Sequence, residues 1–97
     1  MTPESFQAFE AQALMQGFDA ALCREWAPDT QVATHTHPFA VKAVMVQGEL
    51  WLTLDGRTRH LTPGDWFELA ADVPHDERYG PQGATYWVAR RNAGVSA

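Results

Sequence analysis

The spacing of apolar residues changes once along this chain, from a helical period to a strand period. Residues 2–17, TPESFQAFEAQALMQG, place apolar side chains three and four positions apart, which predicts an amphipathic helix. Thr2 is the expected N-terminal cap, Pro3 suits the first turn, and Gly17 is the expected end of the helix. The apolar stripe of this helix consists of Phe6, Phe9, Ala13 and Leu14.

After residue 17 the pattern is typical of short β-strands separated by turns. Alternating or β-branched residues predict strands over 19–26, 32–41, 40–46, 66–70 and 84–91, and a hairpin within 47–61. Turns are expected at 27–30 and 62–65, and a loop at 71–76. Asp55-Gly56 is a two-residue hairpin signal, and such a turn pairs Trp51 with His60. Strands at this spacing favour a sandwich or barrel over alternating strands and helices.

The whole chain is expected to form one all-β domain. The prediction is a helical lead-in over 1–17, a β-barrel over 18–91 and a frayed tail over 92–97. Hydrophobic residues make up 45% of the 97 residues and include four tryptophans, which is enough apolar material for a single core.

Charge and cysteine content exclude several classes of function. A net charge of −5 argues against nucleic acids and anionic membranes as partners, because phosphate groups are bound by basic surfaces. Cys23 is the single cysteine, so neither an internal disulfide nor a cysteine-based zinc site can form. No apolar run approaches the ~18 residues that span a bilayer, and residues 1–10 lack the features of a secretory signal. We therefore expect a reducing, cytoplasmic setting.

The candidate chemistry lies with the four histidines. On a strand, His35 and His37 would point to the same face about 7 Å apart along the backbone, so both rings could reach one metal ion. Taken alone, such a pair is more often a surface or hydrogen-bonded feature. His75, in a Pro-containing loop after a strand, is the third candidate ligand, while His60 is expected to be structural or solvated.

Two motifs in this order resemble those of the small single-domain cupins. His35, Thr36 and His37 supply the His-x-His of the first cupin motif, and Gly48 falls at its closing glycine. In the second motif Gly64 matches the opening glycine and His75 matches the histidine. The resemblance covers roughly residues 30–90 and implies a jelly-roll β-barrel with a metal held by three histidines, His35, His37 and His75.

The departures from the cupin pattern concern the carboxylate and one loop. The glutamate of the first motif falls on Val41 or, with the longer spacing, on Lys42, and neither can supply a carboxylate. Lys42 is expected to face away from whatever Val41 faces, as a solvated or paired lysine. Three further positions of the second motif differ, and these are Ala70, Asp72 and Tyr79.

The resemblance implies one divalent transition metal, with Zn, Ni, Fe or Mn as candidates, and a small-molecule substrate for a dioxygenase-like or isomerase-like enzyme. The alternative is a non-catalytic cupin that binds a small ligand or a partner protein. Glu68 and Asp76 are candidate carboxylates for orienting His75, and the alternative is that both are simply exposed acids. A homodimer is expected, because the sheet edges of a short barrel need covering. The expected pocket lining comprises Phe39, Val41, Met45, Trp51, Trp66 and Trp87.

Overall fold

The computed structural model describes residues 2–92, which form one helix and six strands. None of the helices in this part of the chain is long and apolar enough to cross a membrane. The elements in chain order are α1 (Phe6–Met15), β1 (Ala20–Trp26), β2 (Gln31–His35), β3 (Phe39–Leu54), β4 (Arg57–Leu61), β5 (Trp66–Leu69) and β6 (His75–Asn92).

The helix forms where the sequence predicts it but starts later. Ser5, not Thr2, is the N-cap, because its extended backbone lets its hydroxyl oxygen accept the N–H of Ala8 at 3.0 Å. Gly17 ends the helix as expected, with a φ of 91° that suits glycine. Leu14 is 52% exposed and does not belong to the buried stripe.

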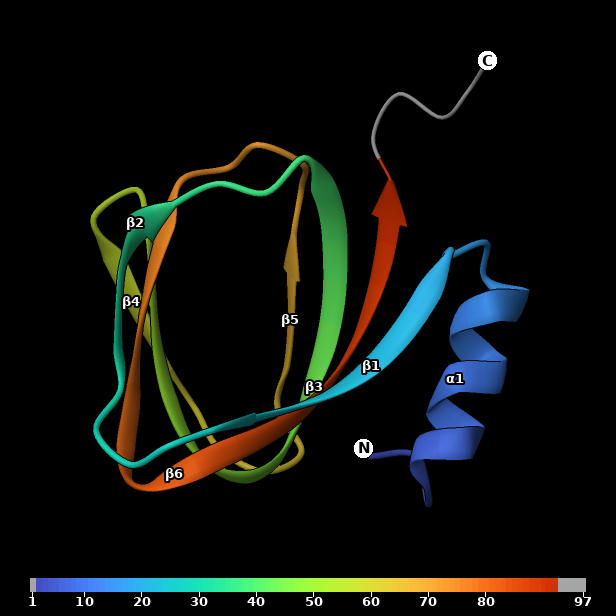
Figure 1. The fold of residues 1–97 in the computed structure, drawn as a ribbon, viewed down its shortest axis with the longest axis horizontal. Helices are drawn as coiled ribbons and strands as arrows, with labels where there is room; N and C mark the ends of the chain where they lie inside the picture. The colour runs from blue at the N-terminus through green and yellow to red at the C-terminus, as the bar shows by residue number, and fades with distance from the viewer. Residues whose placement is uncertain (1, 93–97) are drawn as a thin grey trace.

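The six strands form one antiparallel sheet, in agreement with the all-β prediction. Its main path is β1–β6–β3–β4, while β2 pairs with β6 and β5 pairs with β3. Figure 1 shows the sheet curling so that β2 and β4 lie across from β5, with α1 outside the curl beside β1. The hydrogen-bonded path does not close, so the structure is an open, curled sheet.

Two long strands replace several short ones expected from the sequence. β3 and β6 pair over most of their lengths, with register shifts at Met45/Gln47 and Gly48/Leu50 that let both strands bend. The expected strand at 84–91 is only the second half of β6, and the expected strand through 32–41 is interrupted between His35 and Phe39. Asn92, expected in a frayed tail, ends β6 and its N–H donates to Asp19 Oδ2 at 2.7 Å. The rest of that tail, 93–97, lies outside the described residues.

The β3–β4 hairpin forms as predicted. Asp55 and Gly56 have φ angles of 52° and 76°, the positive values that a two-residue turn of this kind requires. The resulting register pairs Trp51 with His60.

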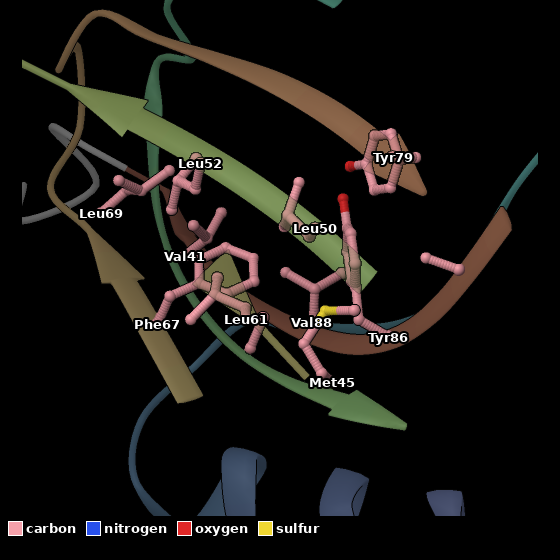
Figure 2. Close-up of a cluster of buried hydrophobic side chains, with 12 residues drawn as sticks. Val41, Met45, Leu50, Leu52, Leu61, Phe67, Leu69, Tyr79, Tyr86 and Val88 are labelled. Carbon is pink, nitrogen blue, oxygen red and sulfur yellow. The ribbon is translucent and has the colours of Figure 1, made fainter. Parts of the chain in front are cut away.

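The core lies inside the curl of the sheet. Side chains from β3, β4, β5 and β6 meet there, and Figure 2 shows ten of them labelled. Several are completely covered, and the largest of these are Tyr79, Met45, Leu50, Leu52 and Leu61.

The outer face of β3 and β6 carries a second, smaller core under α1. Phe9 and Ala13 of the helix pack there against Val44 and Ala89, with Trp66 and Trp87 beside them. Alternation along β3 explains the two cores, because successive side chains point to opposite faces. Lys42 lies on this outer face, where its Nζ donates to Gln16 Oε1 at 3.4 Å, while Val41 belongs to the inner core.

Gly48 lies on β3 directly against the backbone of β6. Its φ is 78°, and a Cβ built on it would overlap the carbonyl oxygen of Gly83 and lie 2.8 Å from Cα of Ala84. Gly56 has nearly the same φ, 76°, but nothing within 4 Å of its Cβ position.

Gly48→Ala should therefore destabilise the protein at least twice as much as Gly56→Ala. The second substitution costs only backbone strain, about 1 kcal/mol, whereas the first also forces two paired strands apart. Denaturant unfolding followed by tryptophan fluorescence measures both. Equal losses in the two variants would show that the β3–β6 contact tolerates a side chain.

The turn before β5 contains a carboxylate whose charge stabilises it. Asp65 Oδ2 accepts the backbone N–H of Thr62 at 2.8 Å and its hydroxyl at 3.2 Å. The hydrogen bond from the Thr62 N–H holds the pKa of Asp65 below its ordinary value of 3.8.

Asp65→Ala should lower stability at neutral pH, and its difference from the wild type should shrink in acid. Because the folded-state pKa of Asp65 is depressed, its contribution is present above the ordinary value of 3.8 and is lost as pH falls through the folded pKa. Thermal unfolding of both proteins between about pH 7 and about pH 3 measures this. A difference that stays constant across the range would contradict it.

Candidate metal centre

Three histidines meet at the end of the curled sheet where β2 stops and β6 begins. His35 is the last residue of β2 and His75 the first of β6, and the two are directly paired across these strands. His37 comes from the connection between β2 and β3. One ring nitrogen from each histidine lies within 4.8 Å of the other two, which brings all three expected ligands together.

Backbone carbonyls fix the tautomers of two of these rings. Nδ1 of His35 lies 2.8 Å from the carbonyl oxygen of Ala33, and Nδ1 of His75 lies 2.9 Å from that of Val73. A carbonyl only accepts hydrogen bonds, so each Nδ1 carries the proton and donates it. In the neutral form of each ring, Nε2 is then the nitrogen that carries the lone pair and can bind a metal. This is the usual second contact of a metal-binding histidine.

A buried carboxylate completes the cluster. Glu77 follows His75 by two positions on β6, so both side chains point into the curl, and Glu77 is only 8% exposed. Its Oε2 lies 3.4 Å from Nε2 of His35 and 3.7 Å from Nε2 of His75. Its other oxygen, Oε1, accepts a hydrogen bond from the hydroxyl of Tyr79.

Nε2 of His35 and Nε2 of His75 converge on the same carboxylate oxygen of Glu77. The separations of 3.4 and 3.7 Å are longer than a good N–H···O hydrogen bond. Ligand atoms about 2.1 Å from a common ion lie about 3.0 Å apart in an octahedron and about 3.4 Å apart in a tetrahedron. The two separations from Glu77 are close to the tetrahedral value, and the three ring nitrogens, within 4.8 Å of one another, form a group that could hold a metal ion.

His37 is held in its neutral form. Burial lowers its pKa below the ordinary value of 6.5, and the nearby rings of His35 and His75 lower it further. Its ring stacks on Phe39 with centroids 4.9 Å apart and an interplanar angle of 13°. The neutral imidazole is the form that binds a metal.

A small cavity adjoins the cluster inside the curl. Its volume is about 40 Å³. The polar groups on its wall are His37, His75, Glu77 and Arg90, and the apolar ones include Phe39 and Val41.

The remaining residues expected to line the pocket lie elsewhere. Met45 is fully buried in the inner core. Trp66 and Trp87 pack under α1 on the outer face of the sheet, and Trp51 lies in a separate groove, stacked on His60 with centroids 4.4 Å apart. The sequence pattern identified these tryptophans as apolar positions but could not assign their faces.

The loop before β6 keeps its shape despite the loss of glycine. Asp72 adopts a φ of 64°, the left-handed conformation expected for the glycine of the second motif. Its N–H donates to the carbonyl oxygen of His37 at 2.7 Å, which ties the loop to the first histidine motif.

Other polar residues considered from the sequence do not join the cluster. His60 pairs with Glu49, Nε2 to Oε2 at 2.6 Å, on an exposed part of the surface, as its structural or solvated role implies. Glu68 is exposed on β5, opposite Lys42. Asp76 lies on the outer face and lines the groove that contains Trp51. The carbonyl of Val73, rather than either acid, orients His75.

The sequence analysis missed Glu77 and Arg90. The signal for Glu77 is its spacing from His75, because a strand that begins at His75 points residues 75 and 77 the same way. Because residues 71–76 were expected to form a loop, the alternation that begins at His75 was not predicted. Arg90 lies on β6 directly opposite Val41, the position that the first cupin motif gives to glutamate.

Comparison with known proteins identifies the family. The family described as the AraC-like ligand binding domain matches residues 19–92. The chain belongs to this family. The resemblance to the small cupins, to which the two histidine motifs point, is thereby confirmed.

Solved structures, one of them described as an RmlC-like cupin, share the fold of this family member. An RmlC-like cupin from Shewanella frigidimarina has a TM-score of 0.68 at 24% identity, with 78% of this chain and 68% of that chain covered. KdgF from Halomonas sp. has a TM-score of 0.64 at 21% identity, with 80% and 73% covered. The DMSP lyase DddQ from Ruegeria pomeroyi has a TM-score of 0.70 at 24% identity, with 80% of this chain but only 40% of that chain covered. No curated protein matches the chain.

Proposed function

We propose that this cupin binds one divalent transition metal through His35, His37 and His75, with Glu77 as a fourth ligand, and uses the centre to act on a small molecule. The observation that carries the proposal is the convergence of one ring nitrogen from each of the three histidines, with the carboxylate of Glu77 beside Nε2 of His35 and Nε2 of His75. With both Nδ1 protons donated to carbonyls, each neutral ring offers its Nε2 to a cation that the carboxylate also attracts.

The donor set limits the metal to a few candidates. Three imidazoles and one carboxylate suit Zn, Ni, Fe(II) or Mn, and the same ligands accept several of these. A bound ion of this kind polarises an oxygen of the ligand or lowers the pKa of a bound water molecule. Glu77 is the carboxylate that Val41 cannot supply, reached from β6 instead of β3.

The protein's own residues define what approaches the metal. The cavity beside His37 and His75 gives the small molecule its place, and Phe39 and Val41 exclude water from one side of it. Tyr79 holds Glu77 through one oxygen and leaves the other directed at the histidines. Burial raises the pKa of Tyr79, so it remains a hydrogen-bond donor.

A second candidate function is ligand binding without turnover. The family name, ligand binding domain, favours it. The same metal centre and cavity serve this function, and a search for product formation with metal-loaded protein separates the two candidates.

The same proposal includes a cytoplasmic location and a homodimer. Cys23 is a free, exposed thiol on β1, which suits a reducing cytoplasm. β1 pairs with β6 on one side only among the described strands, so its other edge can be covered in a homodimer. Light scattering distinguishes the 10.8 kDa chain from a dimer.

Protein purified without a histidine tag should contain close to one transition metal per chain. His37→Ala and His75→Ala should each lose most of it, because each removes a ligand, whereas His60→Ala should keep it. Elemental mass spectrometry measures the content after reconstitution and desalting. If the parent protein takes up no metal, or if His60→Ala loses as much as the others, the proposed centre is wrong.

Glu77→Gln should weaken metal binding at least tenfold while the metal-free protein becomes no less stable. The substitution removes a charged ligand, yet glutamine keeps the shape of the side chain and an oxygen that can accept the hydrogen bond from Tyr79. Competition with a metal-sensitive chelator gives the affinity, and thermal unfolding of the metal-free protein gives the stability.

Glu49→Gln is the matched control for this test. Glu49 also lies against a histidine, but on the exposed surface away from the cluster. Unchanged metal affinity in Glu77→Gln, or an equal loss in Glu49→Gln, would remove Glu77 from the ligand set.

A further inference from the structure

Arg90 brings a positive charge to the cavity without a partner for it. Its side chain lies on the wall of the same cavity as His37, His75 and Glu77. Its Nε is buried and makes no hydrogen bond. Within residues 2–92, its side chain makes a cation–π interaction, with Cζ 4.5 Å from the ring centroid of Phe39.

The residue opposite Arg90 explains why the arginine is unpaired. Val41 is its partner across β3 and β6, and both side chains line the cavity. A glutamate at position 41 would place a carboxylate there, but valine offers none.

The one carboxylate on the cavity wall is committed elsewhere. Glu77 directs one oxygen to the hydroxyl of Tyr79 and the other to His35 and His75, and no ion pair joins it to Arg90 in the described part of the chain. A divalent ion, one carboxylate and one guanidinium together leave the cavity with a net positive charge. A partly buried guanidinium without a counter-ion favours an anion that comes from outside.

We propose that the small molecule bound beside the metal is a carboxylic acid, whose carboxylate pairs with Arg90. This inference rests on the proposed metal centre and adds the chemical class of its ligand. The planar fork of a guanidinium matches the two oxygens of a carboxylate, which a point charge does not.

The size of the cavity limits the acid to a short one. A volume of about 40 Å³ leaves room for only a small molecule. A carboxylate at Arg90 with one oxygen-bearing carbon toward His37 and His75 fills this space. A 2-hydroxy or 2-oxo acid of two or three carbons has this shape.

The chain supplies a matched control for Arg90. Arg91 is the next residue on β6 and faces the other way, with Nη2 donating to the carbonyl oxygen of Gln16 at 2.9 Å and Cζ 4.5 Å from the ring centroid of Phe18. Its substitution removes the same charge from the outer face of the sheet and leaves the cavity intact.

Glycolate is the probe, and glycolamide, its neutral amide of nearly the same shape, is the control ligand. Chemical-shift titrations in two-dimensional NMR give the dissociation constants for zinc-loaded and metal-stripped protein. The wild type should bind glycolate at least tenfold more tightly than glycolamide. Arg90→Gln should abolish that preference, and Arg91→Gln should leave glycolate binding within about twofold of the wild type.

Val41→Glu tests the same idea without removing the arginine. The new carboxylate lies opposite Arg90 and should compete with glycolate, so binding should weaken at least tenfold while the NMR spectrum shows a folded protein. Equal affinity for glycolate and glycolamide in the wild type, or unchanged glycolate binding in Arg90→Gln, would overturn the inference.

The two proposals fail in different ways. If zinc does not bind but metal-stripped protein still prefers glycolate through Arg90, the metal centre is wrong and the anion site stands. If zinc binds at the three histidines and glycolate binding does not depend on Arg90, the metal centre stands and the carboxylic acid assignment is wrong.

Discussion

The arrangement of this site depends on the alternation of side chains at the start of β6. His75, Glu77 and Tyr79 occupy every second position, so a single strand sends all three side chains into the curl of the sheet. The pairing of β6 with β2 then sets His35 directly beside His75. The carboxylate of Glu77 thereby lies beside two imidazole rings, in a cluster whose three histidines could hold a metal ion.

The rest of the fold keeps that arrangement rigid. Tyr79 is 1% exposed and sits in the inner core, so the donor that holds Glu77 has little freedom to move. Asp72 ties the loop before β6 to the backbone of His37. On the other side of the sheet, α1 covers β3 and β6 and leaves the cavity side free of helix. The site therefore lies beside a small cavity at one end of a packed core.

Local signals in the sequence predicted local structure well. Asp55-Gly56 identified a hairpin and its register, because the turn itself dictates the pairing. Gly17 correctly predicted the end of the helix, because the positive φ found there suits glycine. The predicted N-cap, Thr2, was wrong because Thr2 and Ser5 both suit that role. Ser5 is the one that precedes the turn that packs Phe9 against the sheet.

Features that depend on the pairing of strands far apart in the sequence could not be predicted from local patterns. An apolar residue such as Trp66 or Trp87 can pack on either face of a sheet. Their packing under α1 shows that they lie on the outer face, away from the cavity. Glu77 was hidden because the length of β6 comes from its pairing with β3, not from a strand pattern of its own. Arg90 acquires its significance from Val41, a neighbour across two strands that are far apart in the sequence.

The most direct test of the metal centre is a crystal structure of zinc-loaded protein with anomalous diffraction at the zinc edge. The account predicts a single strong peak within bonding distance, about 2.0–2.2 Å, of one ring nitrogen from each of His35, His37 and His75 and of one oxygen of Glu77. A peak beside His60 and Glu49 instead, or no peak in crystals grown with excess zinc, would contradict it.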